Sequence, residues 1–148
     1  MSYLAPDPID PAALLENFTR AATGAGAIVS FTGIMRVEGG VQKLWLDHHP
    51  RLTEPAIGEV EAEAKQRFEL DALTILHRIG SVAPGEPIVF VAAASRHRRA
   101  AFDAVDYMMD RLKTDAPLWK RESSASGERW IEARSEDHAD RARWERKA

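Results

Sequence analysis

Hydrophobic positions repeat along this chain with two different spacings, one typical of helices and one typical of strands. Between residues 53 and 68 the apolar side chains follow at intervals of three or four, which predicts an amphipathic helix. Residues 26–36 are instead rich in β-branched and aromatic side chains, which favours a strand. The same patterns predict helices over residues 11–23, 53–68 and 98–114, and strands over residues 26–36, 44–48, 73–80, 87–94, 118–122 and 129–133.

Short polar residues stand where the predicted helices should begin. Asp10 precedes a proline, a pair typical of an N-cap and the first helical position. Thr53 and Ser95 are expected to cap the second and third helices in the same way. Residues 135–148 are polar and charged, so we expect a tail that is helical at best and mobile. The sequence therefore predicts a single α+β domain over residues 1–148, without a βαβ phosphate loop.

The composition is that of an ordinary globular domain. The chain has 148 residues, 45% of them hydrophobic, which is enough for one core. No apolar run approaches the roughly 18 residues that span a bilayer. The N-terminus also lacks the basic segment and apolar stretch of a secretory signal. We therefore expect a cytoplasmic protein that has no membrane partner.

The chain contains no cysteine. Disulfides, thiolate metal sites and a cysteine nucleophile are therefore all excluded. Any sulfur chemistry at this protein must use sulfur that another molecule supplies.

Charge is spread unevenly around a formal net charge of −3. Residues 1–94 carry 7 Lys and Arg against 12 Asp and Glu, whereas residues 95–148 carry 13 against 11. An acidic body with a basic last third does not match the broad positive face of a nucleic-acid-binding protein. It predicts a small, local site for an anion.

The densest basic cluster is Arg96-His97-Arg98-Arg99, at the predicted start of a helix. Free backbone N–H groups and the helix dipole favour an anion at that end, and a bound phosphate would also offset the repulsion between the dipole and these cations. A solvated basic turn explains the local pattern equally well.

Three further cations are candidates for the same site. Lys113 ends the third predicted helix, where a lysine is also a common cap. Lys120 follows in a short strand beside a second cation, and such a neighbour can lower the pKa of a lysine and activate it. Arg36 ends the first strand and could bind a phosphate through two hydrogen bonds. Taken singly, each is more often a solvated charge.

Histidines suggest a metal site, but their positions argue against one. His48 and His49 are adjacent on a strand and should point to opposite faces, and no carboxylate or thiolate spacing around His77 completes a ligand set. We expect neither a metal nor a cofactor.

The order of several motifs resembles one family over roughly residues 10–135. The most specific motif is Pro117-Leu118-Trp119-Lys120-Arg121-Glu122, which follows a lysine at the end of a helix. The other matching strings are Gly26-Ala27, Phe31-Thr32-Gly33, Arg36, Thr53-Glu54, His77-Arg78-Ile79-Gly80, Pro84-Gly85-Glu86, Ser95-Arg96-His97-Arg98, Ala101-Phe102, Leu112-Lys113, Gly127 and Trp130. The chain resembles the large, catalytic subunit of molybdopterin synthase.

This resemblance implies a sulfurtransferase. The family converts cyclic pyranopterin monophosphate into molybdopterin by inserting two sulfurs as a dithiolene. The sulfur arrives as a thiocarboxylate on the C-terminal Gly-Gly of a small ubiquitin-like partner subunit, which agrees with the absence of cysteine. The resemblance also implies an α/β hammerhead-type α+β domain with a mixed or antiparallel sheet and packed helices. It further implies a homodimer that binds one small subunit at each outer end as a heterotetramer.

The resemblance also implies a role for each candidate residue. Lys113 and Lys120 match the catalytic lysines, Lys113 facing the thiocarboxylate and Lys120 assisting and holding substrate. The residues that match substrate-binding positions are Arg36, His97, Arg98 and Arg134, the last reaching the site of a neighbouring protomer. Two departures from the family pattern are a shorter turn after Arg36 and a histidine, His49, where a tyrosine is usual.

Two other functions compete with this one. The first is a phosphate-binding module that has kept the fold without the chemistry, although the lysines at 113 and 120 argue against it. The second is a metal-independent cyclic phosphodiesterase that uses His97 with a lysine. This second activity would need no partner subunit.

Overall fold

The computed structural model of the chain describes residues 3–36, 40–124, 127–131 and 135–146. Its helices are α1 (Pro11–Ala21), α2 (Thr53–Arg67), α3 (Arg98–Asp115) and α4 (Ser135–Ala142), followed by a short 3-10 turn, η1 (Arg143–Arg146). Its strands are β1 (Leu4–Ala5), β2 (Ala27–Ile34), β3 (Val41–His48), β4 (Ala72–Arg78), β5 (Gly80–Val82), β6 (Pro87–Ser95), β7 (Leu118–Ser124) and β8 (Gly127–Ile131). The predicted α+β class is confirmed.

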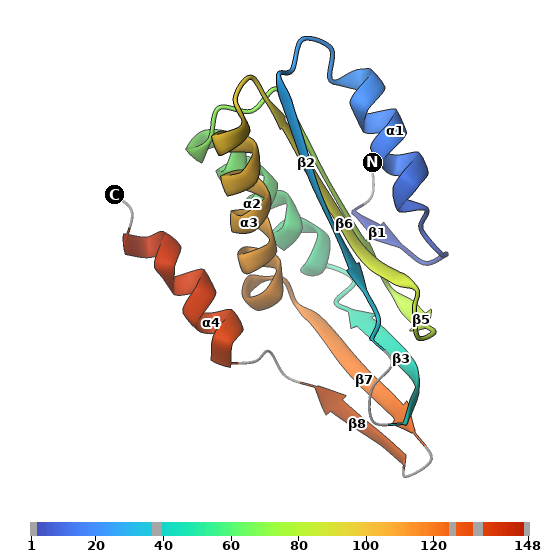
Figure 1. The fold of residues 1–148 in the computed structure, drawn as a ribbon. Helices are drawn as coiled ribbons and strands as arrows, with labels where there is room; N and C mark the ends of the chain where they lie inside the picture. The colour runs from blue at the N-terminus through green and yellow to red at the C-terminus, as the bar shows by residue number, and fades with distance from the viewer. Residues whose placement is uncertain (1–2, 37–39, 125–126, 132–134, 147–148) are drawn as a thin grey trace.

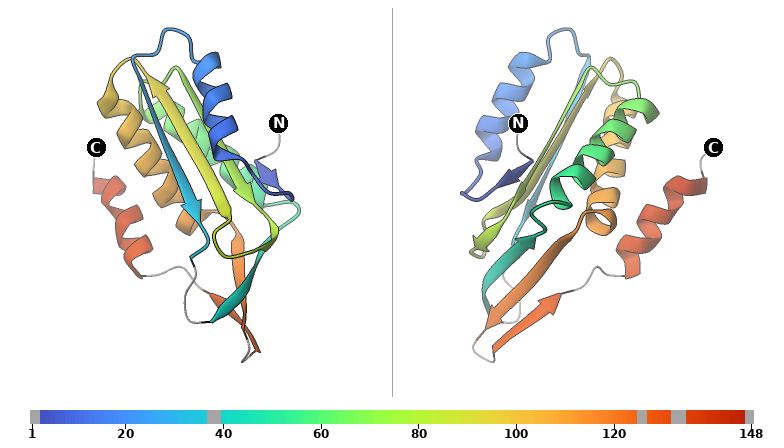
Figure 2. Two further views of the ribbon diagram at one scale, coloured as in Figure 1. Left: turned by 45° about the vertical axis from the view of Figure 1, so that its right-hand side comes forward. Right: turned by 180° about the vertical axis from the view of Figure 1, so that it is seen from behind.

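Two four-stranded sheets organise these elements. The first sheet has the strand order β1-β4-β6-β2, in which β1 runs parallel to β4 and the other pairs are antiparallel. Helices α2 and α3 cover one of its faces and α1 lies on the other (Figure 1, Figure 2). The second sheet has the order β5-β3-β7-β8 and is antiparallel throughout. It extends the molecule beyond the ends of β2 and α3 (Figure 1).

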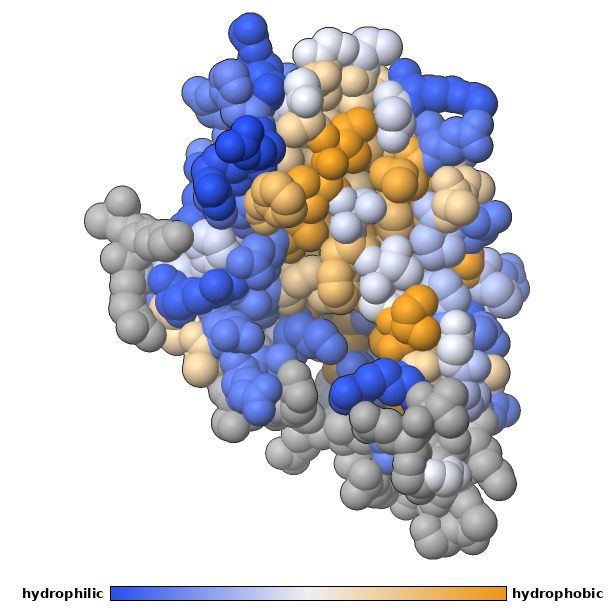
Figure 3. Space-filling view, in the orientation of Figure 1, coloured by the Kyte–Doolittle hydropathy of each residue, from blue (hydrophilic) through white to orange (hydrophobic). Residues whose placement is uncertain are grey.

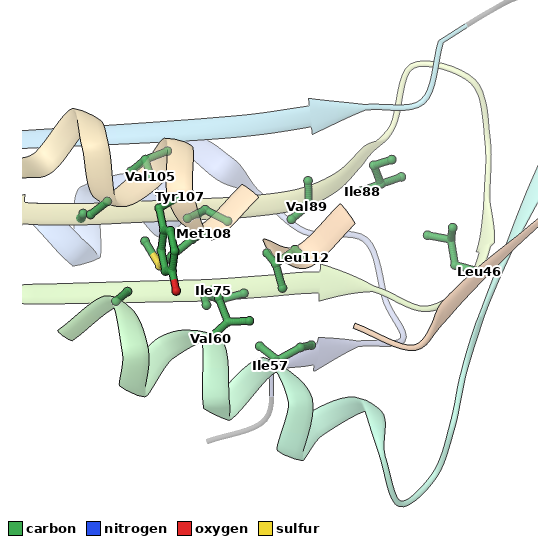
Figure 4. Packing of buried hydrophobic residues seen from close by; sticks show 14 of the residues in the cluster. Leu46, Ile57, Val60, Ile75, Ile88, Val89, Val105, Tyr107, Met108 and Leu112 are labelled. Atoms are coloured by element: carbon green, nitrogen blue, oxygen red, sulfur yellow. The ribbon is translucent and has the colours of Figure 1, made fainter. Parts of the chain in front are cut away.

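The core lies between the first sheet and the helices α2 and α3. Strand β6 is central, and its residues from Ile88 to Ser95 are buried on both faces of the sheet. Its alternate side chains, among them Val89, pack against the apolar stripes of the two helices (Figure 4). The predicted stripes are confirmed, since Ile57, Val60, Ala64, Ala101, Val105, Met108 and Leu112 are all buried.

One predicted strand is divided between the two sheets. Residues 73–80 read as a single strand, but the chain leaves the first sheet after Arg78 and enters the second at Gly80. Gly80 has a φ of 84°, which side chains with a Cβ rarely adopt. The glycine therefore allows the backbone to turn from one sheet into the other, and apolar periodicity alone could not reveal this change.

Two of the three predicted helix caps are wrong. Asp10 does cap α1, because its carboxylate accepts a hydrogen bond from the backbone N–H of Ala13 at 3.2 Å. Thr53 instead lies inside α2 and donates its hydroxyl to the carbonyl of Pro117 at 2.8 Å, which ties α2 to the start of β7. Ser95 donates to the carbonyl of Glu69 at 2.7 Å. Both hydroxyls donate to distant carbonyls, and neither accepts a hydrogen bond from an N–H of the first turn of its helix, since Ser95 accepts from His97 and Thr53 from His49.

The tail forms a helix, α4, that packs against α3 (Figure 1). Trp144 is only 4% exposed and packs edge-on against Phe68 and Tyr107. Its indole N–H donates to Asp110 at 2.6 Å, and its carbonyl accepts a hydrogen bond from Arg67 at 2.6 Å. Trp144 is therefore part of the core cluster, and the expected mobility of the tail stays a prediction.

Glycine at position 26 is required by a close approach of two backbones. A Cβ there would overlap the carbonyl oxygen of Arg96, whereas a Cβ on Gly58, inside α2, would meet the Tyr3 ring at an ordinary 3.8 Å. We expect Gly26→Ala to lower the free energy of unfolding by about 2 kcal/mol because the strands must move apart. Gly58→Ala should raise it by up to about 1 kcal/mol through helix propensity. Urea unfolding of both variants tests this, and equal effects would contradict it.

Candidate functional site

The candidate site lies where the two sheets meet, at the C-terminal ends of β2, β4 and α3. Arg36 follows β2, His77 is near the end of β4, and Lys113 lies in the last turn of α3. Lys120 is the third residue of β7, which begins directly after α3. Chain direction alone therefore brings these four residues to one end of the molecule.

Lys120 is placed by the register of the second sheet. It stands opposite Leu46 of β3, which in turn stands opposite Gly80 of β5. Side chains in such a cross-strand row share one face of a sheet. Leu46 is 1% exposed and belongs to the core, so the stem of Lys120 lies on the face that turns toward the first sheet. Strand β4, which carries His77, ends at Arg78, two residues before Gly80.

His77 is buried between this core and the cations. Its Nδ1 lies 2.6 Å from the carbonyl oxygen of Arg78, and its backbone N–H donates to Tyr3 at 2.8 Å. Burial, together with the positive charges of Lys120 and Lys113, lowers the pKa of His77 to about 4. The imidazole is therefore neutral at ordinary pH, and both predicted catalytic lysines act electrostatically on it.

An ion pair between the buried Arg78 and the partly exposed Glu86 holds the junction of the two sheets next to this histidine. Arg78 donates to the Glu86 carboxylate at 2.9 Å and to the Ser81 carbonyl at 2.7 Å. The backbone of Met35 binds the same turn twice, donating to the Glu86 carbonyl and accepting from Gly85. These bonds tie β4, β5 and the turn before β6 to the end of β2. The residue that follows Met35 is Arg36, so the same bonds fix where Arg36 leaves the sheet.

An apolar surface leads along the molecule toward this end. Phe31 and Ile34 on β2 are 41% and 46% exposed, and Phe102 on α3 is 54% exposed. Figure 3 shows hydrophobic side chains gathered over β2 and α3. Strand β2 is also an edge of its sheet, so its outer backbone groups face away from the other strands. Large exposed apolar groups beside an open strand edge favour contact with another polypeptide.

His97 and Arg98 lie at the opposite end of α3 from Lys113. They are exposed at its N-terminus, and a rise of 1.5 Å per residue puts Arg98 about 22 Å from Lys113 along the helix. Within one chain the structure therefore does not bring the predicted anion-binding pair to the lysines. Arg134, the remaining candidate, lies outside the described residues.

His49 has a structural position. His49 accepts hydrogen bonds from the backbone N–H groups of Arg51 and Leu52 at 3.1 and 3.2 Å, just before α2. The histidine that replaces a tyrosine in the family pattern thus orders the entry to this helix. Among the described residues there is no group of three His, Cys, Asp or Glu side chains that could hold a metal ion. No helix in that part of the chain is long and apolar enough to cross a membrane.

Comparison with known proteins decides the family. The model of the MoaE protein family matches residues 4–115. The chain belongs to the MoaE family. A molybdopterin synthase catalytic subunit from Pseudomonas aeruginosa is 50% identical over 92% of this chain and 93% of its own. One from Caulobacter vibrioides is 44% identical over 98% and 97%.

Solved structures of the MoaE family share the fold. The MoaE protein of Burkholderia ambifaria has a TM-score of 0.83 and 37% identity, covering 98% of this chain and 99% of that one. A molybdopterin synthase chain from Staphylococcus aureus has a TM-score of 0.78 and 26% identity, covering 88% and 96%. The predicted family and its fold are therefore confirmed.

Sequence reasoning did not select His77 as a site residue. It considered this histidine only as a metal ligand, because a lone histidine on an apolar strand has no chemical partner in the sequence. The available signal was its place in the string His77-Arg78-Ile79-Gly80, where an apolar strand meets a turn. Its closeness to Lys113 and Lys120 depends on the packing of α3 and β7 and is a tertiary property.

Burial of the neutral imidazole should make this MoaE-family protein less stable in acid. The folded-state pKa of His77 is about 4, below the usual value of 6.5, so the unfolded chain binds the extra proton first. We expect the stabilisation to be complete above pH 6.5 and to be lost as the pH falls toward 4, by about 3 kcal/mol in all. Urea unfolding between pH 7 and pH 4 measures it. The variant His77→Gln should lack this pH-dependent part of the free energy of unfolding. If the free energies of the variant and the wild type changed with pH in the same way, the prediction would be contradicted.

Proposed function

We propose that this chain is the catalytic subunit of a cytoplasmic molybdopterin synthase, which converts cyclic pyranopterin monophosphate into molybdopterin. The observation that carries this function is that relatives 44% and 50% identical, over more than nine tenths of both chains, are catalytic subunits of that enzyme. The structure adds two lysines whose charges meet at one buried histidine. The chain has no cysteine, so a partner must supply both sulfurs.

Lys113 and Lys120 have the charge that this reaction needs. Transfer of sulfur from a thiocarboxylate develops negative charge on the acyl group and on the substrate as the cyclic phosphate opens. Cations held at fixed positions stabilise such charge more than water does, because they need not reorient. We assign Lys113 to the thiocarboxylate and Lys120 to the substrate, with Arg36 as a further contact to the substrate anion.

A small ubiquitin-like subunit ending in Gly-Gly is the proposed sulfur donor. The exposed apolar side chains of Phe31, Ile34 and Phe102 offer a surface for it, beside the outer edge of β2. An extended tail placed between β2 and α3 would be led to Lys113 at the C-terminal end of α3.

The separation of the anion-binding residues supports a homodimer. His97 and Arg98 are about 22 Å from Lys113 along α3, too far to hold the same small substrate within one chain. A twofold arrangement can instead place the N-terminal end of one α3 near the C-terminal end of another. We propose that each site combines Arg36, Lys113 and Lys120 of one protomer with His97 and Arg98 of the other. With a small subunit on each, the assembly is a heterotetramer.

Replacement of Lys120 tests the chemistry. In a complex reconstituted with a thiocarboxylated small subunit and the cyclic precursor, Lys120→Ala should lower the rate of dithiolene formation about 100-fold, because one stabilising charge is lost. Lys65→Ala is the matched control, since Lys65 is an exposed lysine on α2 that pairs with Glu61. Unchanged turnover by the Lys120 variant would refute the assignment. Hydrolysis of the precursor without a partner and without sulfur incorporation would indicate a phosphodiesterase instead.

Mixing two inactive variants tests the shared site. One variant carries His97→Ala and Arg98→Ala, and the other carries Lys120→Ala. After subunit exchange, half of the dimers are mixed and one of their two sites carries neither change, so about a quarter of all sites should be intact. Activity should return to about that fraction of wild type. Mixed dimers that are verified by native mass spectrometry but stay inactive would contradict a site shared between protomers.

A further inference from the structure

We propose that Thr53 is a positioning residue for the two lysines: its hydroxyl holds the turn between α3 and β7 and so sets where Lys113 and Lys120 stand relative to each other. This role rests on the function proposed above, in which both lysines act during one reaction. Thr53 is the first residue of α2 and is 0% exposed. Because it is completely buried, it can affect a substrate only through the residues that it holds.

The turn that Thr53 holds is short and lies between the two lysines. Only Ala116-Pro117 connects α3 to β7. Pro117 follows Lys113 by four residues and precedes Lys120 by three. The N–H of Leu118 donates to the Ala116 carbonyl at 2.8 Å, which closes a tight turn around the proline. A helix and a strand leave from the two ends of this turn, so its geometry sets the distance and the angle between the lysines.

The Thr53 hydroxyl adds one further rung to the ladder between β3 and β7. The last pair of this ladder is His48 with Leu118, and the same register would next bring His49 opposite Pro117. The hydroxyl stands in that place, because it accepts from the N–H of His49 at 2.7 Å and donates to the carbonyl of Pro117 at 2.8 Å. A hydroxyl has a single proton, so both hydrogen bonds have a fixed direction.

The hydroxyl is itself held in place by the loop before α2. The N–H of Thr53 donates to the carbonyl of His49 at 3.2 Å, while the N–H of His49 binds the hydroxyl, so two reciprocal bonds close the loop. The His49 ring accepts from the N–H groups of Arg51 and Leu52 in the same loop. The branched side chain of threonine also has few rotamers. The hydroxyl is therefore aimed at the turn before any substrate arrives.

The other end of the turn is fixed by separate contacts. Asp115, the last residue of α3, is bound by Arg111 of the same helix and by Arg141 of α4. These ion pairs do not involve Thr53, and they hold the end of α3 whether or not its hydroxyl is present. Loss of the hydroxyl would therefore move the start of β7, and with it Lys120, while α3 stays in place.

The proposed reaction is sensitive to such a movement. Sulfur transfer brings a thiocarboxylate and a substrate together, and each lysine must stand beside the charge that develops on its own partner. Displacement of a reacting group by about 1 Å can lower a rate by about 100-fold. Attraction of the anionic substrate changes much less, because both positive charges remain at the site. The hydroxyl should therefore affect kcat more than KM.

Replacement of the hydroxyl tests this role in the reconstituted complex with a thiocarboxylated small subunit and the cyclic precursor. Thr53→Val keeps the shape of the side chain, and we expect it to lower kcat for dithiolene formation about 30-fold with KM for the precursor changed by less than about twofold. Thr53→Ser keeps the hydroxyl and should stay within about threefold of wild type.

Tyr107→Phe is the matched control for the loss of a buried hydroxyl. The Tyr107 hydroxyl also links two groups, since it accepts from Arg111 at 2.6 Å and donates to Glu63 at 3.2 Å, but it does not touch the turn between the lysines. This variant should be less stable and keep the wild-type kcat. If Thr53→Val and Tyr107→Phe had the same kcat, the positioning role of Thr53 would be overturned.

A second readout does not depend on catalysis. Residual dipolar couplings of the backbone amides give the orientation of β7 relative to α3. This orientation should change in Thr53→Val and stay in Thr53→Ser, and an unchanged orientation in Thr53→Val would refute the role even if the rate fell. Thr53→Ala takes the place of Thr53→Val if the latter does not fold. If the wild-type complex forms no dithiolene, the proposed function fails, but the couplings still decide whether Thr53 sets the orientation of β7.

Discussion

The ion pair between the buried Arg78 and the partly exposed Glu86 holds the point where the chain passes from the first sheet to the second. The Arg78 side chain is 3% exposed and also binds a backbone carbonyl, and Glu86 in turn accepts a hydrogen bond from the N–H of Ala83. Removal of Glu86 would leave the buried guanidinium of Arg78 without its charged partner in a poorly solvated place, which is destabilising. Because β2, β4, β5 and the turn before β6 all attach here, the geometry of the candidate site depends on this pair.

The site on that joint is unusual in having several cations around a buried neutral ring. Two like charges at such a site repel each other, and in the proposed function a phosphate and a thiocarboxylate would offset this repulsion. The acidic groups nearby are already engaged, as Glu86 is with Arg78. Binding of an anionic substrate therefore completes the electrostatics of the site. This also explains how a chain of net charge −3 can attract anions locally.

The opposite side of α3 is stabilised by a different network. Arg111 bridges Glu63 of α2 and Asp115 within α3, and Asp115 also binds Arg141 of α4. Arg143 adds contacts to Asp106 and Asp110, beside the buried Trp144. Helix α3 is thus held on three sides, by the sheet, α2 and α4. A rigid α3 fixes the distance between the basic residues at its start and Lys113 at its end.

The sequence by itself determined the fold class, most of the helices and strands, and the identity of the cationic residues. Apolar spacing reports local geometry, so the stripes of α2 and α3 and the buried strand β6 could be read directly. The order of motifs also identified the family, because it extends along nearly the whole domain. The caps at Thr53 and Ser95 could not be read, since their hydroxyls bind carbonyls distant in sequence.

Only the tertiary structure decided which of these residues meet. It divided the apolar residues 73–80 between two sheets at Gly80. The positive φ of this glycine lets the backbone turn out of the first sheet. It brought His77 under the charges of Lys113 and Lys120, and it placed His97 and Arg98 at the far end of the same helix. The sequence shows which cationic residues are present but not how far apart they lie. The rise of the helix and the register of the strands set those distances. The candidate site is therefore two separate groups within one chain rather than a single cluster.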